Sequence, residues 1–267
     1  DLAIITNISK AHIGNFKSFN ELIKTKNQIF NNVELNGEIF INIDDENIKI
    51  PKNNKNNISI TSYSFNKKAD ITAQLNIAGI KINHSNKNKA ILIDIPPEII
   101  HLKNIILSTY AITSSIGIDI KDFQNALKTY KLPRGRGQII NFNNCQIIDD
   151  SYNANPSSMK MGINRLSDLS STGRKIAVLG DMLELGNSSI QAHEIIGKLI
   201  NSKKIEIIFT YGELMKITYK VLDKTKLQAF HYIDYKQLYN KFHSIIKKND
   251  LIYIKGSRAM QLERLYL

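Results

Sequence analysis

Short apolar runs and longer amphipathic segments alternate through the second half of the chain, and this pattern predicts strands and helices in turn. The apolar runs, which suit buried strands, are Gln146–Ile148, Lys175–Leu179, Ile205–Phe209, Ala229–Ile233 and Leu251–Lys255. The segments with helical spacing are Ser157–Leu169, Ile190–Ile200, Leu214–Leu222, Tyr235–Lys247 and Arg258–Leu265. Such alternation predicts an α/β domain in which crossover helices connect the strands of a doubly wound parallel sheet.

The first half of the chain mixes strand and helix patterns less regularly. The predicted strands are Leu2–Ile8, Glu38–Ile43, Ser59–Phe65, Ile71–Ile77, Gly79–Asn83 and Ala90–Ile95, and the predicted helices are Phe19–Phe30, His101–Gly117 and Ile120–Tyr130. The last four strands are short and separated by Asn, Lys and Gly, which suggests an antiparallel meander. An acidic turn at Asp44–Glu46 could bind a metal ion, although an isolated acidic turn is more often only a turn.

A domain boundary is predicted near residue 132. The segment Leu132–Gln138 (LPRGRGQ) places a proline, two glycines and two arginines directly after a predicted helix, as a linker would. A chain of 267 residues is also long for one core, so we expect domains at residues 1–132 and 133–267. An arginine between glycines is also well suited to hold a phosphate with its planar fork, so a phosphate contact stays open as the second interpretation beside the favoured linker.

Polar clusters follow three of the predicted parallel strands, at Asp149–Asn155, Gly180–Glu184 and Lys255–Arg258. The carboxyl ends of parallel strands meet at one edge of a sheet, where ligands of such sheets bind. The N-terminus of the helix that follows each strand offers unpaired N–H groups to anions. The sequence therefore predicts a site for a nucleotide or an acidic substrate at this edge.

The formal charge of +12 does not by itself indicate nucleic-acid binding. The lysines are dispersed and accompany abundant Asn and Ile, as in Pro51–Ile58, which is what an AT-rich coding sequence would produce. We expect a preference for anionic ligands, no nucleic-acid partner and a monomer. No apolar run reaches the roughly 18–20 residues of a membrane span, and no signal peptide is evident, so the chain is predicted to be cytoplasmic. The single Cys145 cannot form an internal disulfide.

Several ordered motifs resemble the Mur ligase family. Those that resemble its C-terminal domain are Asp149–Met159 (DDSYNANPSSM), Val178–Gly186 (VLGDMLELG), His193 and Ile254–Glu263 (IKGSRAMQLE). Those that resemble its central ATPase domain are Thr6–Phe16 (TNISKAHIGNF) and Thr25–Phe30 (TKNQIF). The resemblance implies a partial central ATP-binding domain at 1–132 and a Rossmann-like, doubly wound C-terminal domain at 133–267.

The resemblance also implies a reaction and a set of site residues. The reaction is ATP-dependent, Mg²⁺-assisted amide formation through an acyl phosphate, and the motifs are most similar to those of ligases that join D-alanyl-D-alanine to UDP-N-acetylmuramoyl-tripeptide for peptidoglycan synthesis. His12 and Lys26 would be metal-binding and catalytic, with Lys26 carbamylated, although the helical pattern alone places Lys26 in solvent. The residues expected to contact ATP are Arg136, Asp150, Asn153 and Asn104. The residues expected near the peptide substrates are Asp181, Lys255 and Ser257.

Three departures from the family pattern change what is expected of this chain. No GxxxxGK[ST] phosphate loop occurs, Gly14 replaces an acidic residue, and HLKN at His101–Asn104 stands where the family has HNxxN. We therefore expect the carboxy-terminal two-thirds of a ligase that is inactive alone. The alternatives are a decayed, non-catalytic binding protein that keeps the fold, or another amide ligase of the superfamily such as folylpolyglutamate synthase.

Overall fold

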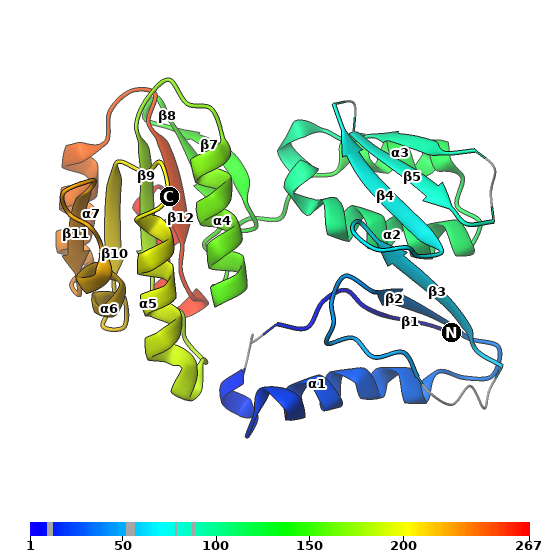
Figure 1. The fold of residues 1–267 in the computed structure, drawn as a ribbon. Helices are drawn as coiled ribbons and strands as arrows, with labels where there is room; N and C mark the ends of the chain where they lie inside the picture. Colours follow the sequence, from blue (N-terminus) through cyan, green and yellow to red (C-terminus); the bar gives the residue numbers. More distant parts are fainter. Residues whose placement is uncertain (10–12, 52–56, 78, 87–88) are drawn as a thin grey trace. The chain divides into compact units, whose positions relative to one another are not determined.

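The computed structural model describes residues 1–9, 13–51, 57–77, 79–86 and 89–267, so the predicted metal-binding residue His12 lies outside the described residues. The chain forms two compact units (Figure 1). The first consists of Asp1–Ser9 and Ser18–Lys131, and the second of the described residues 13–17 with Leu132–Leu267. Among the described residues no helix is long and apolar enough to cross a membrane.

The described part of the first unit contains a mixed six-stranded sheet. Its strands in spatial order are β1 (Leu2–Ile5), β2 (Glu38–Asn42), β3 (Ser59–Ser64), β4 (Ile71–Asn76), β5 (Gly79–His84) and β6 (Ile91–Asp94). The strands β1 to β4 run parallel, and only β4, β5 and β6 form the predicted antiparallel meander, so the prediction was wrong for β3. A short connection suffices between parallel β3 and β4 because they overlap in only two residue pairs.

Three α-helices accompany this sheet in the described residues: α1 (Phe19–Asn27), α2 (Lys103–Ser115) and α3 (Ile120–Thr129). Ser18 caps α1, since its hydroxyl accepts the N–H of Glu21 at 3.2 Å. The α-helix ends at Asn27, earlier than predicted, and continues as a 3₁₀ helix over Gln28–Asn32. The side-chain amide of Asn27 ties this last turn to the next loop by donating to the carbonyl of Asn47 at 2.9 Å.

The acidic turn after β2 connects the ends of neighbouring strands through hydrogen bonds to its carboxylates. The carboxylate of Asp44 accepts the hydroxyl of Ser64 at 2.6 Å and the N–H of Phe65 at 2.7 Å. The carboxylate of Asp45 accepts the N–H of Ile8 at 2.6 Å, just beyond β1. Both carboxylates therefore serve as turn and strand-end acceptors, as most acidic turns do.

The described part of the second unit contains a six-stranded sheet that confirms the predicted doubly wound α/β architecture. Its strands in spatial order are β11 (Gln228–Tyr232), β10 (Ile207–Tyr211), β9 (Lys175–Gly180), β12 (Leu251–Lys255), β8 (Cys145–Asp149) and β7 (Gln138–Phe142). The strands β11 to β8 are parallel. The α-helices are α4 (Pro156–Asp168), α5 (Ser189–Ile200), α6 (Met215–Val221) and α7 (Tyr235–Ile245).

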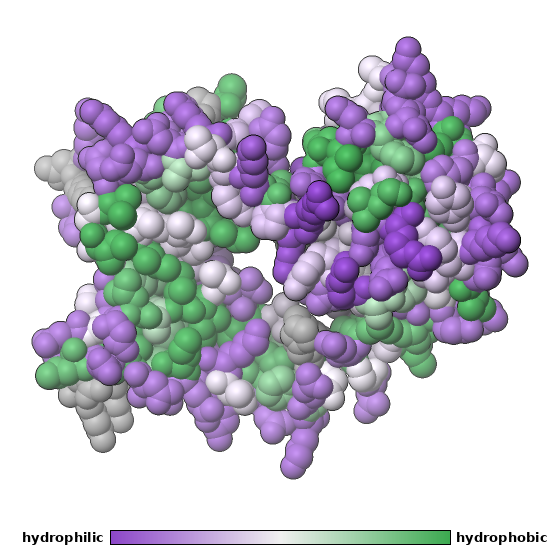
Figure 2. All heavy atoms as spheres, turned by 180° about the vertical axis from the view of Figure 1, so that it is seen from behind, coloured by the Kyte–Doolittle hydropathy of each residue, from purple (hydrophilic) through white to green (hydrophobic). Residues whose placement is uncertain are grey.

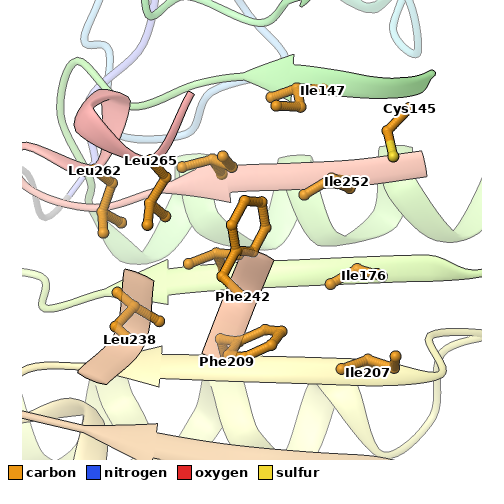
Figure 3. Packing of buried hydrophobic residues seen from close by; sticks show 12 residues of the cluster. Cys145, Ile147, Ile176, Ile207, Phe209, Leu238, Phe242, Ile252, Leu262 and Leu265 are labelled. Atoms are coloured by element: carbon orange, nitrogen blue, oxygen red, sulfur yellow. The ribbon is translucent and has the colours of Figure 1, made fainter. Parts of the chain in front are cut away.

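Each face of this sheet buries a different set of side chains, because successive residues of a strand point to opposite faces. Figure 3 shows Leu238 and Phe242 of α7 packed on Phe209 of β10, with Leu262 and Leu265 from the C-terminal segment beside them. The opposite face packs against α4, where Tyr253 of β12 approaches the helix.

Two elements of the second unit differ from the sequence predictions. The antiparallel strand β7 was not predicted; it pairs with β8 through a turn in which Asn143 and Asn144 have φ of 47° and 61°. Two successive residues of positive φ are typical of a tight hairpin turn. The predicted helix Arg258–Leu265 is instead two 3₁₀ helices, Arg258–Met260 and Leu262–Leu265, separated by Gln261 in the left-handed region at φ 47°.

The short segment before α1 belongs to the second unit. Its 3₁₀ helix Ile13–Asn15 packs on the 3₁₀ helix Gly186–Ser188, and the N–H of Gly14 donates to the carbonyl of Glu184 at 3.1 Å. A Cβ on Gly14 would lie 3.0 Å from that carbonyl oxygen. This close backbone approach gives a physical reason for glycine at the position where the family pattern has an acidic residue.

The surface of the described residues is mostly hydrophilic with local apolar patches. Figure 2 shows hydrophilic side chains spread over the visible face of both units, interrupted by hydrophobic areas. The exposed large apolar residues of the first unit include Leu2, Leu35 and Ile50. Exposed apolar side chains are common on protein surfaces and by themselves indicate no partner.

Candidate functional site

The structure brings the three predicted polar clusters of the second unit together. They follow β8, β9 and β12, which are parallel neighbours, so their carboxyl ends meet at one edge. Hydrogen bonds join the clusters directly: the N–H of Ser257 donates to the carbonyl of Asp181 at 2.9 Å, and the ammonium of Lys255 donates to the carbonyl of Asn153 at 2.8 Å. The three clusters therefore meet at one sheet edge, as the sequence predicts.

Asp150 lies at the centre of a largely buried polar network. Its Oδ2 accepts the ammonium of Lys255 at 2.8 Å and the phenol of Tyr253 at 2.9 Å. The Lys255 side chain is 2% exposed and that of Asp150 is 23% exposed, so the ion pair sits at the boundary between the core and solvent. Burial lowers the pKa of Lys255 while Asp150 opposes that shift, and burial raises the pKa of Tyr253. The phenol stays protonated and acts as a donor.

The arginine-containing loop after Leu132 is tied to this strand end. The N–H of Gly135 donates to Oδ2 of Asp149 at 2.8 Å, and the N–H of Tyr152 donates to the carbonyl of Gly135 at 3.1 Å. Gly135 has φ of 72°, and a Cβ there would lie 2.8 Å from the nitrogen of Tyr152, so the loop needs glycine. The exposed guanidinium of Arg136 stacks 4.0 Å from the centre of the Tyr152 ring. Stacking preorganises a cation that can reach an anionic ligand.

A cavity of about 760 Å³ opens beside the same loop. Arg134, Ser151 and Arg258 line it together with Tyr266. Asp149 also lines it and is 3% exposed. Its carboxylate accepts both the N–H and the hydroxyl of Ser151, at 3.1 and 2.6 Å. The side chain of Asp149 therefore builds the wall of the cavity with its acceptor capacity largely used.

Two of the predicted substrate-binding residues are engaged within the protein. Asp181 is 6% exposed, and its carboxylate caps α6 by accepting the N–H of Met215 at 2.7 Å. Gly212 leaves room for this carboxylate, since a Cβ there would lie 2.5 Å from it. Ser257 is 4% exposed, and its hydroxyl accepts the N–H of Leu183 at 2.8 Å. Both groups fix loop geometry at the edge of the site.

Buried His193 holds the loop after β9 from the side of α5. Its Nδ1 lies 2.7 Å from the carbonyl of Ser189, and its Nε2 accepts the N–H of Met182 at 3.2 Å. This pair of contacts requires the neutral tautomer with the proton on Nδ1. Burial lowers the pKa of His193, which favours the same neutral state.

Three of the predicted site residues have exposed side chains, in contrast to buried Asp181 and Ser257. Lys26 is exposed on α1, four residues after buried Leu22, and Asn104 is exposed in the first turn of α2. The exposure of Asn153 in the second unit is similar, with its Oδ1 accepting the N–H of Ala154 at 2.8 Å. Their roles stay predictions.

The described residues differ in how well they suit Mg²⁺ and a nucleotide. No group of three or more His, Cys, Asp or Glu side chains within them is arranged to hold a metal ion. For a nucleotide the second unit offers an exposed guanidinium at Arg136 and the Asp150 carboxylate, whose Oδ1 has no hydrogen bond among the described residues. These groups suit phosphate and ribose hydroxyls, respectively.

Comparisons with known proteins agree with this architecture. The Mur ligase middle domain matches residues 1–112, and the Mur ligase, glutamate ligase domain matches residues 135–258. The chain belongs to the Mur ligase family. It is 30% identical over 271 residues to the UDP-N-acetylmuramoyl-tripeptide--D-alanyl-D-alanine ligase of Rickettsia prowazekii, which covers 99% of this chain and 60% of that ligase. The chain thus spans about three-fifths of the length of this Mur ligase.

Solved structures show the same fold. The crystal structure of MurF from Acinetobacter baumannii matches with a TM-score of 0.81 at 23% identity, covering 99% of this chain and 58% of that one. MurF from Thermotoga maritima in complex with ADP matches with a TM-score of 0.76 at 22% identity, covering 99% and 60%. These matches confirm the predicted fold class. It consists of an α/β middle domain of the Mur ligases followed by their doubly wound C-terminal domain.

Proposed function

We propose that this protein serves the ATP-dependent, ADP-forming ligation of D-alanyl-D-alanine to UDP-N-acetylmuramoyl-tripeptide in the synthesis of peptidoglycan precursors. The observation that carries the proposal is the similarity to a ligase of that name along 99% of the chain. The strand-end site supports it, because the site combines an exposed arginine with a carboxylate in the position expected for a nucleotide.

Each residue near the strand ends has a distinct task in this proposal. Arg136 contacts the phosphates or the ribose of the nucleotide, and Asp150 accepts hydrogen bonds from the ribose hydroxyls. ATP supplies the phosphoryl group that activates the substrate carboxylate as an acyl phosphate, which the amine of the dipeptide attacks to release phosphate. Asp181 and Ser257, being buried, hold the loops that border the acceptor. His12 and Lys26 stay predicted residues of the magnesium side, with Asn104 and Asn153 near the nucleotide.

Titration of the chain with ADP, followed by calorimetry, tests the nucleotide part of the proposal. We expect Arg136→Met and Asp150→Asn each to weaken ADP binding by about tenfold, since each removes a charge-assisted hydrogen bond. Lys248→Met, an exposed lysine at the opposite edge of the sheet, is the matched control and should leave the affinity unchanged. Absence of ADP binding at millimolar concentration would overturn the proposal.

The acceptor part is tested by adding D-alanyl-D-alanine to the ADP-loaded protein. We expect saturable binding of the dipeptide and none of L-alanyl-L-alanine. The sequence contains no GxxxxGK[ST] motif, so these 267 residues alone should release no phosphate from ATP. Phosphate release that depends on both peptide substrates would contradict that expectation, and equal binding of the two dipeptides would contradict the assigned acceptor.

A further inference from the structure

Two buried donors from one strand converge on a single oxygen of Asp150. The phenol of Tyr253 and the ammonium of Lys255 reach Oδ2 at 2.9 and 2.8 Å. The two residues are separated by one position on β12 and therefore point to the same face of the sheet. Tyr253 is 1% exposed and Lys255 2% exposed, so neither side chain can meet a ligand without displacing the protein around it.

The phenol reaches Asp150 only because α4 has a glycine at the crossing point. A Cβ on Gly162 would lie 1.7 Å from the phenol oxygen of Tyr253 and 2.0 Å from the ring carbon that carries it. Glycine inside a helix lowers the stability of the helix relative to alanine. Helix α4 nevertheless has glycine at the position where the Tyr253 ring packs against it. The pair Gly162 and Tyr253 thus belongs to the polar network and not only to the packing between helix and sheet.

This arrangement decides which oxygen of Asp150 is free. Both donors occupy Oδ2, and Oδ1 has no hydrogen bond among the described residues. A carboxylate fixed at one oxygen cannot rotate freely, and its second oxygen keeps one direction toward the ligand. Functional groups held by such supporting contacts bind with less loss of conformational freedom than unsupported ones.

We propose that Tyr253, together with Lys255, is a positioning residue that aims Oδ1 of Asp150 at the ribose of the nucleotide. This inference rests on the proposed function, since it needs a nucleotide beside Asp150. It also changes the expected role of Lys255, which acts through Asp150 and not by contact with the peptide substrate. The class of ligand recognised is a nucleotide with free vicinal ribose hydroxyls.

Comparison of ADP with 2′,3′-dideoxyadenosine diphosphate isolates the contact. The quantity measured is the ratio of the two dissociation constants, which reports the ribose hydroxyls and cancels the contributions of phosphate and adenine. We expect the wild-type chain to favour ADP by about tenfold, the size of a hydrogen bond to a charged group. Tyr253→Phe and Lys255→Met should each reduce this preference to about threefold or less, and Asp150→Asn should abolish it.

Matched variants separate positioning from a general loss of structure. Tyr211→Phe removes a phenol from the same sheet, and Lys248→Met removes an exposed ammonium; both should keep the wild-type ratio. Binding of the dideoxy compound serves as an internal measure of folding, because it should change little in Tyr253→Phe. Thermal unfolding of each variant is recorded alongside.

Each outcome decides between the two proposals. If Asp150→Asn loses the ribose preference and Tyr253→Phe retains it in full, the positioning role is overturned while the proposed function stands. If the wild-type chain binds both nucleotides equally, Asp150 does not contact ribose and the positioning role fails with it. If neither nucleotide binds, the proposed function fails first.

Discussion

Asp149 and Asp150 are adjacent carboxylates at the end of β8 that the fold uses in opposite ways. Asp149 is 3% exposed, and its carboxylate oxygens accept hydrogen bonds from the N–H of Gly135 and the hydroxyl of Ser151. These bonds hold the loop that carries Arg136. Asp150 is held at one oxygen and open at the other. The difference follows from the alternation of side chains along a strand, which sends neighbouring residues toward different faces and partners.

At the same scale, His193 makes the stability of the second unit sensitive to acid. Burial holds its pKa below the ordinary 6.5, and its Nε2 must stay unprotonated to accept the N–H of Met182. In the unfolded chain the imidazole takes up a proton as the pH falls through about 6.5, whereas the folded protein resists it. The free energy of unfolding should therefore decrease as the pH falls below 6.5.

Urea unfolding between pH 7.5 and 5 measures this effect. Burial also lowers the pKa of His231, which should add to the slope in the same direction. The His231→Gln variant therefore isolates the share of His193, and nuclear magnetic resonance of the imidazole should show no titration of His193 near pH 6.5. A folded-state His193 that titrates at its ordinary pKa would refute the explanation.

At the scale of the elements, the crossing of α4 and β12 predicts an unusual response to a helix-favouring substitution. Gly162→Ala should gain up to about 1 kcal/mol of helix propensity. It should nevertheless destabilise the protein by about 3 kcal/mol, because the new methyl group would occupy the position of the Tyr253 phenol, 1.7 Å away. Chemical denaturation of the single variant measures the net change.

The background variant Tyr253→Leu removes the obstacle and provides the control. In that background Gly162→Ala should be neutral or stabilising by about 0.5–1 kcal/mol, as in an ordinary helix interior. An equal loss of stability in both backgrounds would show that the clash is not with the ring.

The success of sequence-based prediction differed between elements for physical reasons. The central parallel strands β8, β9, β10 and β12 were located within two residues of their observed bounds, because such strands tend to be continuous apolar runs. The edge strand β7 alternates between exposed and partly buried residues and lacks that signal. The pair Asn143–Asn144 was the available clue to its hairpin.

The location of the candidate site could be predicted from the sequence, but not which of its side chains are free to bind a ligand. Parallel strands bring their ends together, so the clustering of Asp150, Asp181 and Ser257 followed from the pattern alone. Which of them is free depends on partners far away in sequence, such as Met215 for Asp181 and Leu183 for Ser257. The donors of Asp150 lie more than 100 residues downstream, beyond any local pattern.

For the whole molecule, the dispersed excess of basic residues predicts weak and salt-sensitive attraction to polyanions. The formal charge is +12, yet the lysines are spread along the chain without an aromatic stripe. Retention on immobilised DNA should be lost by about 150 mM salt, where charges more than about 8 Å apart are largely screened. Elution only well above that concentration, or a preference among DNA sequences, would argue for a dedicated nucleic-acid surface.

The contact between Gly14 and Glu184 bears on how this polypeptide can be divided. Residues 13–17 pack with the second unit, although the chain up to Ser9 and from Ser18 onward belongs to the first. A single cut near residue 132 therefore does not yield two intact modules. It leaves the loop around Gly186 without the backbone of Gly14 that packs against it, so a second unit that is to keep this contact must carry residues 13–17 as well.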